Sequence, residues 1–257
     1  MNTTAAVPSH QRLERLTALL QEQGGVQVSQ VAAEWGISEM TVRRDLQRLA
    51  DQGLVARVHG GAVVAGSLRF STRLDHHGRE KKAAVRKLAA TLTTTLPENG
   101  LIYLDGSTTV FHLIEHLGKR PGLQVATNNV DTFHRCAQVP GLQVLLIGGR
   151  LNTETDNLVG PMARRAMEGL AFAAAYTSAF GILPELGPCE PSLDDAEVKQ
   201  LACARAGRVW LAMNHQKFGR GAAATWQLPT SHSTLVSDLN PADPQLTAYR
   251  PLVAEIL

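Results

Sequence analysis

Apolar side chains recur at helical spacing in three stretches of the first sixty residues. The three sets, each on one face of a helix, are Leu13, Leu16 and Leu20; Val28, Val31 and Ala32; and Val42, Leu46 and Leu49. They predict helices over residues 11–20, 29–36 and 39–53, with Ser29 as the N-cap of the second helix. After the third helix, an alternating run over 54–64 predicts a β-hairpin.

A short second helix, a tight turn that contains Gly36 and a longer third helix are typical of the helix-turn-helix motif, whose last helix enters the major groove of DNA. The hairpin would be a wing, with Arg57 and His59 near phosphates or the minor groove. The outward side of the third helix carries arginine, which can bind guanine through two hydrogen bonds. The expected contacts on that helix are Met40, Thr41, Arg43, Arg44, Gln47 and Arg48. The alternative is a solvated helix with an unrelated hairpin, or a three-helix unit used for protein contacts.

Beyond residue 80, predicted strands and helices alternate. A helix over 80–96 is followed by strands at 101–104, 123–127, 144–147, 176–180 and 209–212, and by helices at 110–117, 131–136 and 194–206. This alternation indicates an α/β domain with a mostly parallel sheet covered on both faces. We therefore predict a small winged helix-turn-helix domain over 8–64, a linker over 65–78 and a larger α/β domain over 79–257.

Ligands of such sheets bind where strands end, and the turn 105–109, with the sequence DGSTT, is the strongest candidate. It follows a strand and opens a helix, so backbone N–H groups and hydroxyls would converge on an anion such as phosphate. An ordinary N-cap turn is the alternative. The next helix carries His112 and His116 in a His-x-x-Glu-His string, which we interpret as a surface pair; no metal and no cofactor are expected.

Charge and composition narrow the class of protein. The chain has 257 residues and a net charge of +2, divided as 0 over residues 1–68, +5 over 69–87 and −3 over 88–257. The basic connector either attracts phosphate or solvates a linker. An apolar fraction of 44% excludes a disordered chain. Neither a signal peptide nor a membrane span is predicted, and the three cysteines are interpreted as buried apolar side chains, so we expect a cytoplasmic protein.

The strings QVSQVAAEWGISEMTVRRDLQRL and GLVARVHGGAV resemble the N-terminal winged helix-turn-helix of DeoR-type transcriptional regulators. The matching positions include Ser38, residues 41–46 and residues 59–62. The resemblance implies that residues 41–44 read DNA, and it adds Ser38 to the expected interface.

A weaker resemblance to the effector domain of the same family spans residues 80–238. It implies a fold like that of ribose-5-phosphate isomerase and glucosamine-6-phosphate deaminase, and a site for a phosphorylated sugar or related metabolite. The residues it implies are Asp105, Gly106, Ser107, Thr108 and Thr109 around the phosphate, Asn128 and Gly149 along the site, and Glu197, Lys199 and Lys217 toward the sugar. The chain departs from the family at Asn214, where the family usually has Asp.

Together these features predict a regulator, more specifically a repressor of a carbohydrate-metabolism operon. It would bind an operator in double-stranded DNA as a homo-oligomer, a dimer or a tetramer, and would have no membrane partner. The alternative is a sugar-phosphate isomerase or deaminase with an accessory helix-turn-helix, in which Glu197 is the general base and Lys199 or Lys217 its electrostatic partner. A third hypothesis, a helix-turn-helix used only for protein interactions, predicts no salt-dependent DNA binding.

Overall fold

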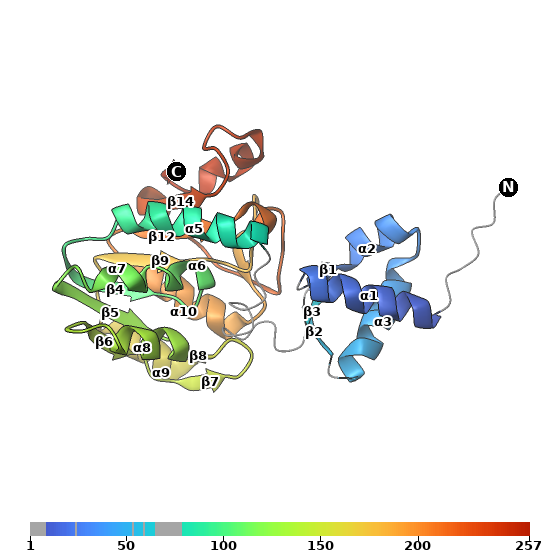
Figure 1. Ribbon diagram of the computed structural model, residues 1–257, viewed down its shortest axis with the longest axis horizontal. Helices are drawn as coiled ribbons and strands as arrows, with labels where there is room; N and C mark the ends of the chain where they lie inside the picture. The colour runs from blue at the N-terminus through green and yellow to red at the C-terminus, as the bar shows by residue number, and fades with distance from the viewer. Residues whose placement is uncertain (1–8, 24, 53, 59, 65–78) are drawn as a thin grey trace. The chain divides into compact units, whose positions relative to one another are not determined.

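The computed structural model describes residues 9–23, 25–52, 54–58, 60–64 and 79–257. The chain divides into two compact units, residues 1–68 and 69–257 (Figure 1). The expected linker, 65–78, and the expected DNA contact His59 lie outside the described residues. The predicted domain boundaries therefore stay a prediction.

The N-terminal unit contains three helices and a small antiparallel sheet. Its elements are α1 (Ser9–Gln23), β1 (Gly25–Gln27), α2 (Val28–Trp35), α3 (Glu39–Asp51), β2 (Val55–Val58) and β3 (Gly61–Val64), with the strand order β1-β3-β2. The three helices and the hairpin are those that the apolar pattern predicts. The apolar stripes form one core, in which Leu16, Val31, Leu46 and Leu49 are buried.

The start of the second helix differs from the prediction. The helix begins at Val28 after Gln27, so Ser29 lies inside it and the predicted N-cap is wrong. The reason is a third strand that the sequence analysis missed. Residues 25–27 pair with β3, and the Val28 N–H donates to the Gly60 carbonyl at 2.8 Å. A strand of three residues is too short to show an alternating pattern.

The C-terminal unit is built on a parallel seven-stranded sheet. In the order of hydrogen-bonded neighbours, its strands are β15 (Glu255–Ile256), β14 (Ser233–Ser237), β12 (Val209–Met213), β9 (Ala174–Thr177), β4 (Asn99–Leu104), β5 (Gly122–Thr127) and β6 (Gln143–Leu146). The central strands are almost entirely apolar, as expected for a parallel sheet buried on both faces.

Helices cover both faces of this sheet (Figure 1). On β4, Ile102 and Leu104 belong to one apolar core and Tyr103 to the other, because successive side chains of a strand point to opposite faces. The helices that contribute to the first core are α5 (Arg79–Thr94), α6 (Thr108–Phe111), α7 (Ile114–Leu117) and α8 (Val130–Ala137), and those of the second are α9 (Pro161–Glu168) and α10 (Leu193–Ala204). The predicted α/β fold class is confirmed.

Two predicted elements have different limits. The predicted helix over 110–117 is two short helices, because the Leu113 N–H donates to Val110, three residues back rather than four. The predicted strand over 176–180 ends at Thr177. Its last residues leave the sheet, and the Phe180 N–H donates instead to the Cys189 carbonyl at 3.1 Å.

Besides α9, β14 and β15, the sequence pattern does not predict two small antiparallel sheets and three 3-10 helices. These elements are β7 (Arg150–Asn152), β8 (Asn157–Val159), β10 (Gly181–Leu183), β11 (Gly187–Glu190), β13 (Ala224–Thr225), η1 (His215–Lys217), η2 (Thr230–His232) and η3 (Pro244–Leu252). All three cysteines are free and buried, as predicted. Among the described residues, no helix has the length and apolar character needed to cross a membrane.

Candidate DNA-binding surface and effector site

Helix α3 begins at a capped and exposed N-terminus. The hydroxyl of Ser38 accepts a hydrogen bond from the Thr41 N–H at 3.2 Å and lies 2.9 Å from the Thr41 hydroxyl. Such a cap satisfies one of the N–H groups that the first turn leaves open. Met40 beside it is 74% exposed. These residues thus fix the end of the helix that the helix-turn-helix motif presents to bases.

The basic side chains of α3 lie on its exposed side, as the apolar pattern predicts. Arg43, Arg44, Gln47 and Arg48 are exposed, whereas Val42 and its apolar partners are buried. Arg43 forms an ion pair with Glu39 at 3.1 Å, with both side chains about half exposed. An exposed pair of this kind contributes little to stability, so Arg43 can exchange it for a partner on DNA.

Arg57 joins the wing to the recognition helix. Its guanidinium donates to the Arg43 carbonyl at 3.3 Å and to the Gln47 side chain at 3.2 Å. Gln47 in turn donates to Asp51 at 2.8 Å. The structure therefore brings three of the expected DNA contacts into one set of hydrogen bonds, with Arg57 holding β2 against α3.

One acid of α3 has no part in that surface. Asp45 is only 1% exposed and its carboxylate accepts two hydrogen bonds from the Arg12 guanidinium of α1. Hydrogen bonding to Asp45, opposed by burial, raises the pKa of Arg12. The pair neutralises itself inside the unit, so the exposed side of α3 is more basic than its sequence composition suggests.

In the C-terminal unit, the carboxyl ends of β4, β5, β9 and β12 meet at one edge of the sheet. The first residues after these strands are Asp105, Asn128, Ser178 and Asn214, and all four are buried. Polar side chains buried together at a strand edge are where an α/β sheet binds its ligand. We call residues 105–109, 127–129, 177–180 and 214–220 the sheet-edge site.

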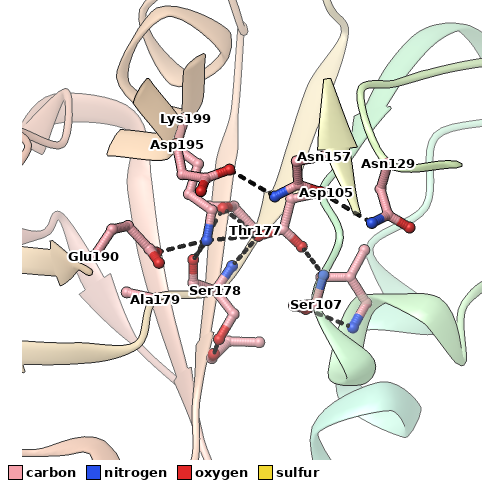
Figure 2. A network of polar contacts seen from close by, with 12 residues as sticks. Asp105, Ser107, Asn129, Asn157, Thr177, Ser178, Ala179, Glu190, Asp195 and Lys199 are labelled. Atoms are coloured by element: carbon pink, nitrogen blue, oxygen red, sulfur yellow. Dashed lines mark hydrogen bonds and ion pairs between the residues drawn. The ribbon is translucent and has the colours of Figure 1, made fainter. Parts of the chain in front are cut away.

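Asp105 holds the DGSTT turn against β9 (Figure 2). One carboxylate oxygen accepts from the Ser107 N–H at 2.8 Å, and the other accepts from the Thr177 hydroxyl at 2.8 Å and the Ser178 N–H at 2.9 Å. The Ser107 hydroxyl accepts from the Val110 N–H at 3.0 Å and caps α6. A buried carboxylate with three such donors shapes the turn; contact with a phosphate would set two negative charges side by side.

Lys199 of α10 lies between two carboxylates (Figure 2). Its ammonium is 2.5 Å from Glu190 and 3.4 Å from Asp105, and it donates to the Ser178 carbonyl at 2.8 Å. Burial alone lowers the pKa of Lys199, but the charges of Glu190 and Asp105 outweigh it and raise the pKa above its ordinary value. Burial raises the pKa of Glu190, and Lys199 opposes that shift. Lys199 is therefore a charged partner of two internal acids.

A chain of amides extends from this centre (Figure 2). Asn129 caps α8 through the Thr132 N–H at 2.8 Å and donates to Asn157 at 3.0 Å. Asn157 donates to Asp195 of α10 at 2.8 Å, and Asp195 also accepts from Asn152 at 2.9 Å. These bonds tie β7, β8, α8 and α10 together around the sheet edge.

The expected residues Gly106, Asn128 and Gly149 occupy tightly packed positions. A Cβ at Gly106 would lie 2.6 Å from the side-chain oxygen of Asn157, and one at Gly149 would lie 2.7 Å from the Val159 carbonyl. Asn128 accepts from the Tyr103 hydroxyl at 2.7 Å and donates to the Leu158 carbonyl at 3.1 Å. All three residues have a role in packing the site.

Glu197 does not join the others. It lies on α10 two residues from both Asp195 and Lys199, and at about 100° per residue this places it on a different side of the helix. Its carboxylate is 3.5 Å from the Arg164 guanidinium of α9, and its side chain is 40% exposed. The structure therefore brings Asp105, Lys199 and Lys217 together and leaves Glu197 outside the group.

Lys217 and Asn214 come from the loop after β12. The Lys217 ammonium donates to the Ser178 hydroxyl and to the Ala179 carbonyl, both at 2.6 Å. Asn214 is 3% exposed, and its side-chain oxygen has no hydrogen-bond partner among the described residues. A buried acceptor without a donor costs free energy, unless a ligand or water supplies the donor.

The residues assigned to the site from the sequence do not include Glu190, Asp195, Asn157 or Ser178. Asp195 and Lys199 stand four residues apart with opposite charge on a predicted helix, which was a readable signal that they share a face. Glu190 lies on a strand that the sequence does not predict, so its contact with Lys199 could not be foreseen. Among the described residues, His, Cys, Asp and Glu side chains form no group of three that could hold a metal ion.

Each of the two units matches a known protein domain. Residues 12–67 match the DeoR-like helix-turn-helix domain, and residues 78–239 match the DeoR C-terminal sensor domain. The chain belongs to the DeoR family. The resemblance stated from the sequence is thus confirmed, and the protein is a DNA-binding transcriptional regulator with a sensor domain.

Individual relatives match most of the chain. The chain is 28% identical to a lactose phosphotransferase system repressor of Streptococcus mutans, over 95% of this chain and 98% of that protein. It is 31% identical to the transcriptional regulator FruR of Bacillus subtilis, over 71% of this chain and 72% of that one. Among solved structures, ribose-5-phosphate isomerase A of Neisseria gonorrhoeae is similar over 52% of each chain, with 14% identity and a TM-score of 0.38.

Proposed function

We propose that this DeoR-family protein is a repressor of a carbohydrate-metabolism operon and that a phosphorylated sugar or related metabolite controls its DNA binding. The observation that supports DNA reading most directly is the exposed basic side of α3, where Arg43, Arg44 and Arg48 lie beside a capped N-terminus. The lactose phosphotransferase system repressor of Streptococcus mutans, matched over almost its whole length, supports the repressor role.

The proposed DNA contacts divide into two groups. Arg43 and Arg44, one turn into α3, are expected to reach base edges, with Met40 and Thr41 beside them. Arg48 and the wing residue Arg57 are expected to reach phosphates or to hold the wing. Ser38 and Gln47 position these groups through hydrogen bonds.

The proposed effector site is the sheet edge. We expect Thr108 and Thr109 of the DGSTT turn and the ammonium of Lys217 to bind the phosphate, whereas Asp105 and Ser107 shape the turn. The unsatisfied oxygen of Asn214 would accept a hydrogen bond from a sugar hydroxyl. A ligand at this position would donate the hydrogen bond that the buried Asn214 oxygen lacks.

We propose regulation rather than catalysis. Glu197, the general base of the enzyme hypothesis, pairs with Arg164 outside the site. The carboxylates at the site, Asp105 and Glu190, both hold Lys199 and are not placed to take a proton from a substrate. A regulator of this kind acts where the chromosome is, which places it in the cytoplasm, and it would bind a symmetric operator as a dimer or tetramer.

Selection of DNA from a random pool by the purified full chain tests this function. We expect enrichment of a symmetric sequence whose affinity falls steeply with salt, as phosphate contacts require. Recovery of no common sequence would contradict it. Turnover of a pentose phosphate or amino-sugar phosphate by the pure protein would favour the isomerase or deaminase alternative.

A further inference from the structure

Three basic side chains converge on residues 178–180, the segment that leaves the sheet after β9. The ammonium of Lys199 donates to the Ser178 carbonyl at 2.8 Å, and that of Lys217 to the Ala179 carbonyl at 2.6 Å. The guanidinium carbon of Arg220 lies 3.7 Å from the centre of the Phe180 ring. The family resemblance implies a site role for both lysines and none for this arginine.

The three cations differ in their partners. Lys199 has two carboxylates, and the two contacts described for Lys217 are to neutral oxygens. Arg220 has the face of an aromatic ring and, among the described residues, no ion pair and no side-chain hydrogen bond. Burial lowers the pKa of Arg220 to about 10, so the group keeps its charge at neutral pH. A largely buried cation without a counter-ion is unfavourable until an anion binds to it.

The chain places Arg220 there by close backbone packing. Gly219 has a positive φ of 73°, and its N–H donates to the Ile182 carbonyl at 3.0 Å. A Cβ at Gly181 would lie 2.0 Å from the Arg220 carbonyl oxygen, so only glycine allows this approach. The loop is thus fixed against the start of β10. The guanidinium lies over its ring partner, and the residue as a whole is neither fully buried nor fully exposed.

We infer that Arg220 binds an oxyanion of the effector, a phosphate or a carboxylate, at the carboxyl end of β12. A guanidinium stacked on a ring keeps its N–H edge available for two parallel hydrogen bonds to such a group. Asn214, on the same loop, offers an acceptor for a hydroxyl. The loop therefore selects a ligand that carries both a hydroxyl and an anionic group, as sugar phosphates and sugar acids do. The inference rests on the proposed function, since it assumes that a metabolite binds at this edge.

The test compares two arginine variants of the full chain by thermal shift. Arg220→Gln removes the proposed contact. Arg208→Gln is a matched control, because Arg208 also stacks on an aromatic ring, with its guanidinium carbon 5.4 Å from Trp210, but at the amino end of the same strand. The probes are inorganic phosphate, glucose 6-phosphate and gluconate, which separate a phosphate from a carboxylate as the bound group.

We expect at least one probe to stabilise the wild-type protein, and Arg220→Gln to weaken its apparent affinity at least about tenfold, as loss of a charge-assisted hydrogen bond does. Arg208→Gln should stay within about twofold, and Arg220→Lys should recover part of the affinity because it restores the charge. Equal affinity of wild type and Arg220→Gln, or no stabilisation of wild type by any probe, would overturn the inference. Specific operator binding by the same protein samples would show that the protein is still a DNA-binding regulator, so that the failure would concern Arg220 alone.

Discussion

The two units use basic side chains in opposite ways. On α3, Arg43, Arg44 and Arg48 are exposed, and the ion pair of Arg43 is with a half-exposed acid. At the sheet edge, Lys199 lies between Glu190 and Asp105, with only 11% of its side chain exposed. Exposed cations suit a large polyanion such as DNA, because the phosphates supply the negative charge and the binding depends on the salt concentration. Buried cations suit a small ligand and a fixed geometry. We therefore propose that the same residue types are recognition groups in the N-terminal unit and mainly structural groups at the sheet edge.

The largest expected effect is the loss of the buried carboxylate. Asp105→Asn keeps the volume but leaves Lys199 with Glu190 as its carboxylate partner. An amide nitrogen in place of the oxygen that faces Lys199 also cannot accept the hydrogen bonds from Thr177 and Ser178. We expect the C-terminal unit to lose about 3–5 kcal/mol of unfolding free energy, as when a buried ion pair loses one partner. Urea unfolding followed by Trp210 and Trp226 fluorescence, in a Trp35→Phe background, measures it.

The control for that experiment lies on the surface. Asp194→Asn breaks the ion pair with Arg150, whose side chain is 69% exposed, and should cost at most about 1 kcal/mol. If Asp105→Asn costs no more than Asp194→Asn, the sheet edge is not organised by its buried charges, and the contrast between the two units fails.

The N-terminal unit also contains a largely buried ion pair, Arg12–Asp45, and we expect its loss to destabilise the unit, as the loss of Asp105 destabilises the sheet edge. Arg12→Ala leaves Asp45 buried without the Arg12 guanidinium, and we expect the unfolding free energy to fall by about 2–3 kcal/mol. This is less than for Asp105→Asn because Arg12 is partly exposed. Trp35 fluorescence reports on this unit. A loss below about 0.5 kcal/mol would show that Asp45 is hydrated rather than dependent on Arg12.

Exposed arginines should affect DNA binding and leave stability unchanged. Arg43→Ala is expected to weaken binding to the selected operator by about tenfold to a hundredfold and to relax specificity at one base pair, because a two-bond contact to a base is lost. Fluorescence anisotropy against single-base operator variants measures both. Arg164→Ala, an exposed arginine of α9, is the control. Equal weakening on every sequence would show that Arg43 holds only phosphate.

Arg57 should have the smallest effect. It contacts the Arg43 carbonyl and Gln47, so Arg57→Ala loosens the wing without removing a base contact. We expect affinity to fall by less than about tenfold, about equally on all sequences, with a shallower salt dependence. A change of preference at a single base pair would mean instead that Arg57 reads DNA directly.

Local pattern was sufficient for the three helices and the hairpin of the N-terminal unit, because they are close in sequence and their apolar stripes are regular, but it did not predict β1. Leu46 is buried and Arg44 exposed because they lie on opposite sides of one helix. The sheet edge depends on contacts between distant segments. Asp105 meets Lys199 across 94 positions, and Glu190 lies on a short strand with no alternating pattern.

The motif at residues 105–109 thus pointed to the candidate site, but it did not assign the roles of the residues around it. Asp105 and Ser107 shape the turn, and Glu197 faces Arg164. Among the described residues, the side-chain oxygen of Asn214 has no hydrogen-bond donor, and the guanidinium of Arg220 has no anionic partner. Which side chain remains unsatisfied depends on the whole set of packed neighbours, and spacing along the chain does not contain that information.

The central claim is that metabolite binding at the sheet edge changes DNA binding by α3. The most direct measurement is a titration of the selected operator by anisotropy, without and with a saturating concentration of a compound that stabilises the protein. We predict a change in operator affinity of about 5-fold to 150-fold, the usual range of allosteric coupling. An affinity that stays the same within about twofold, for every compound that binds, would contradict the claim.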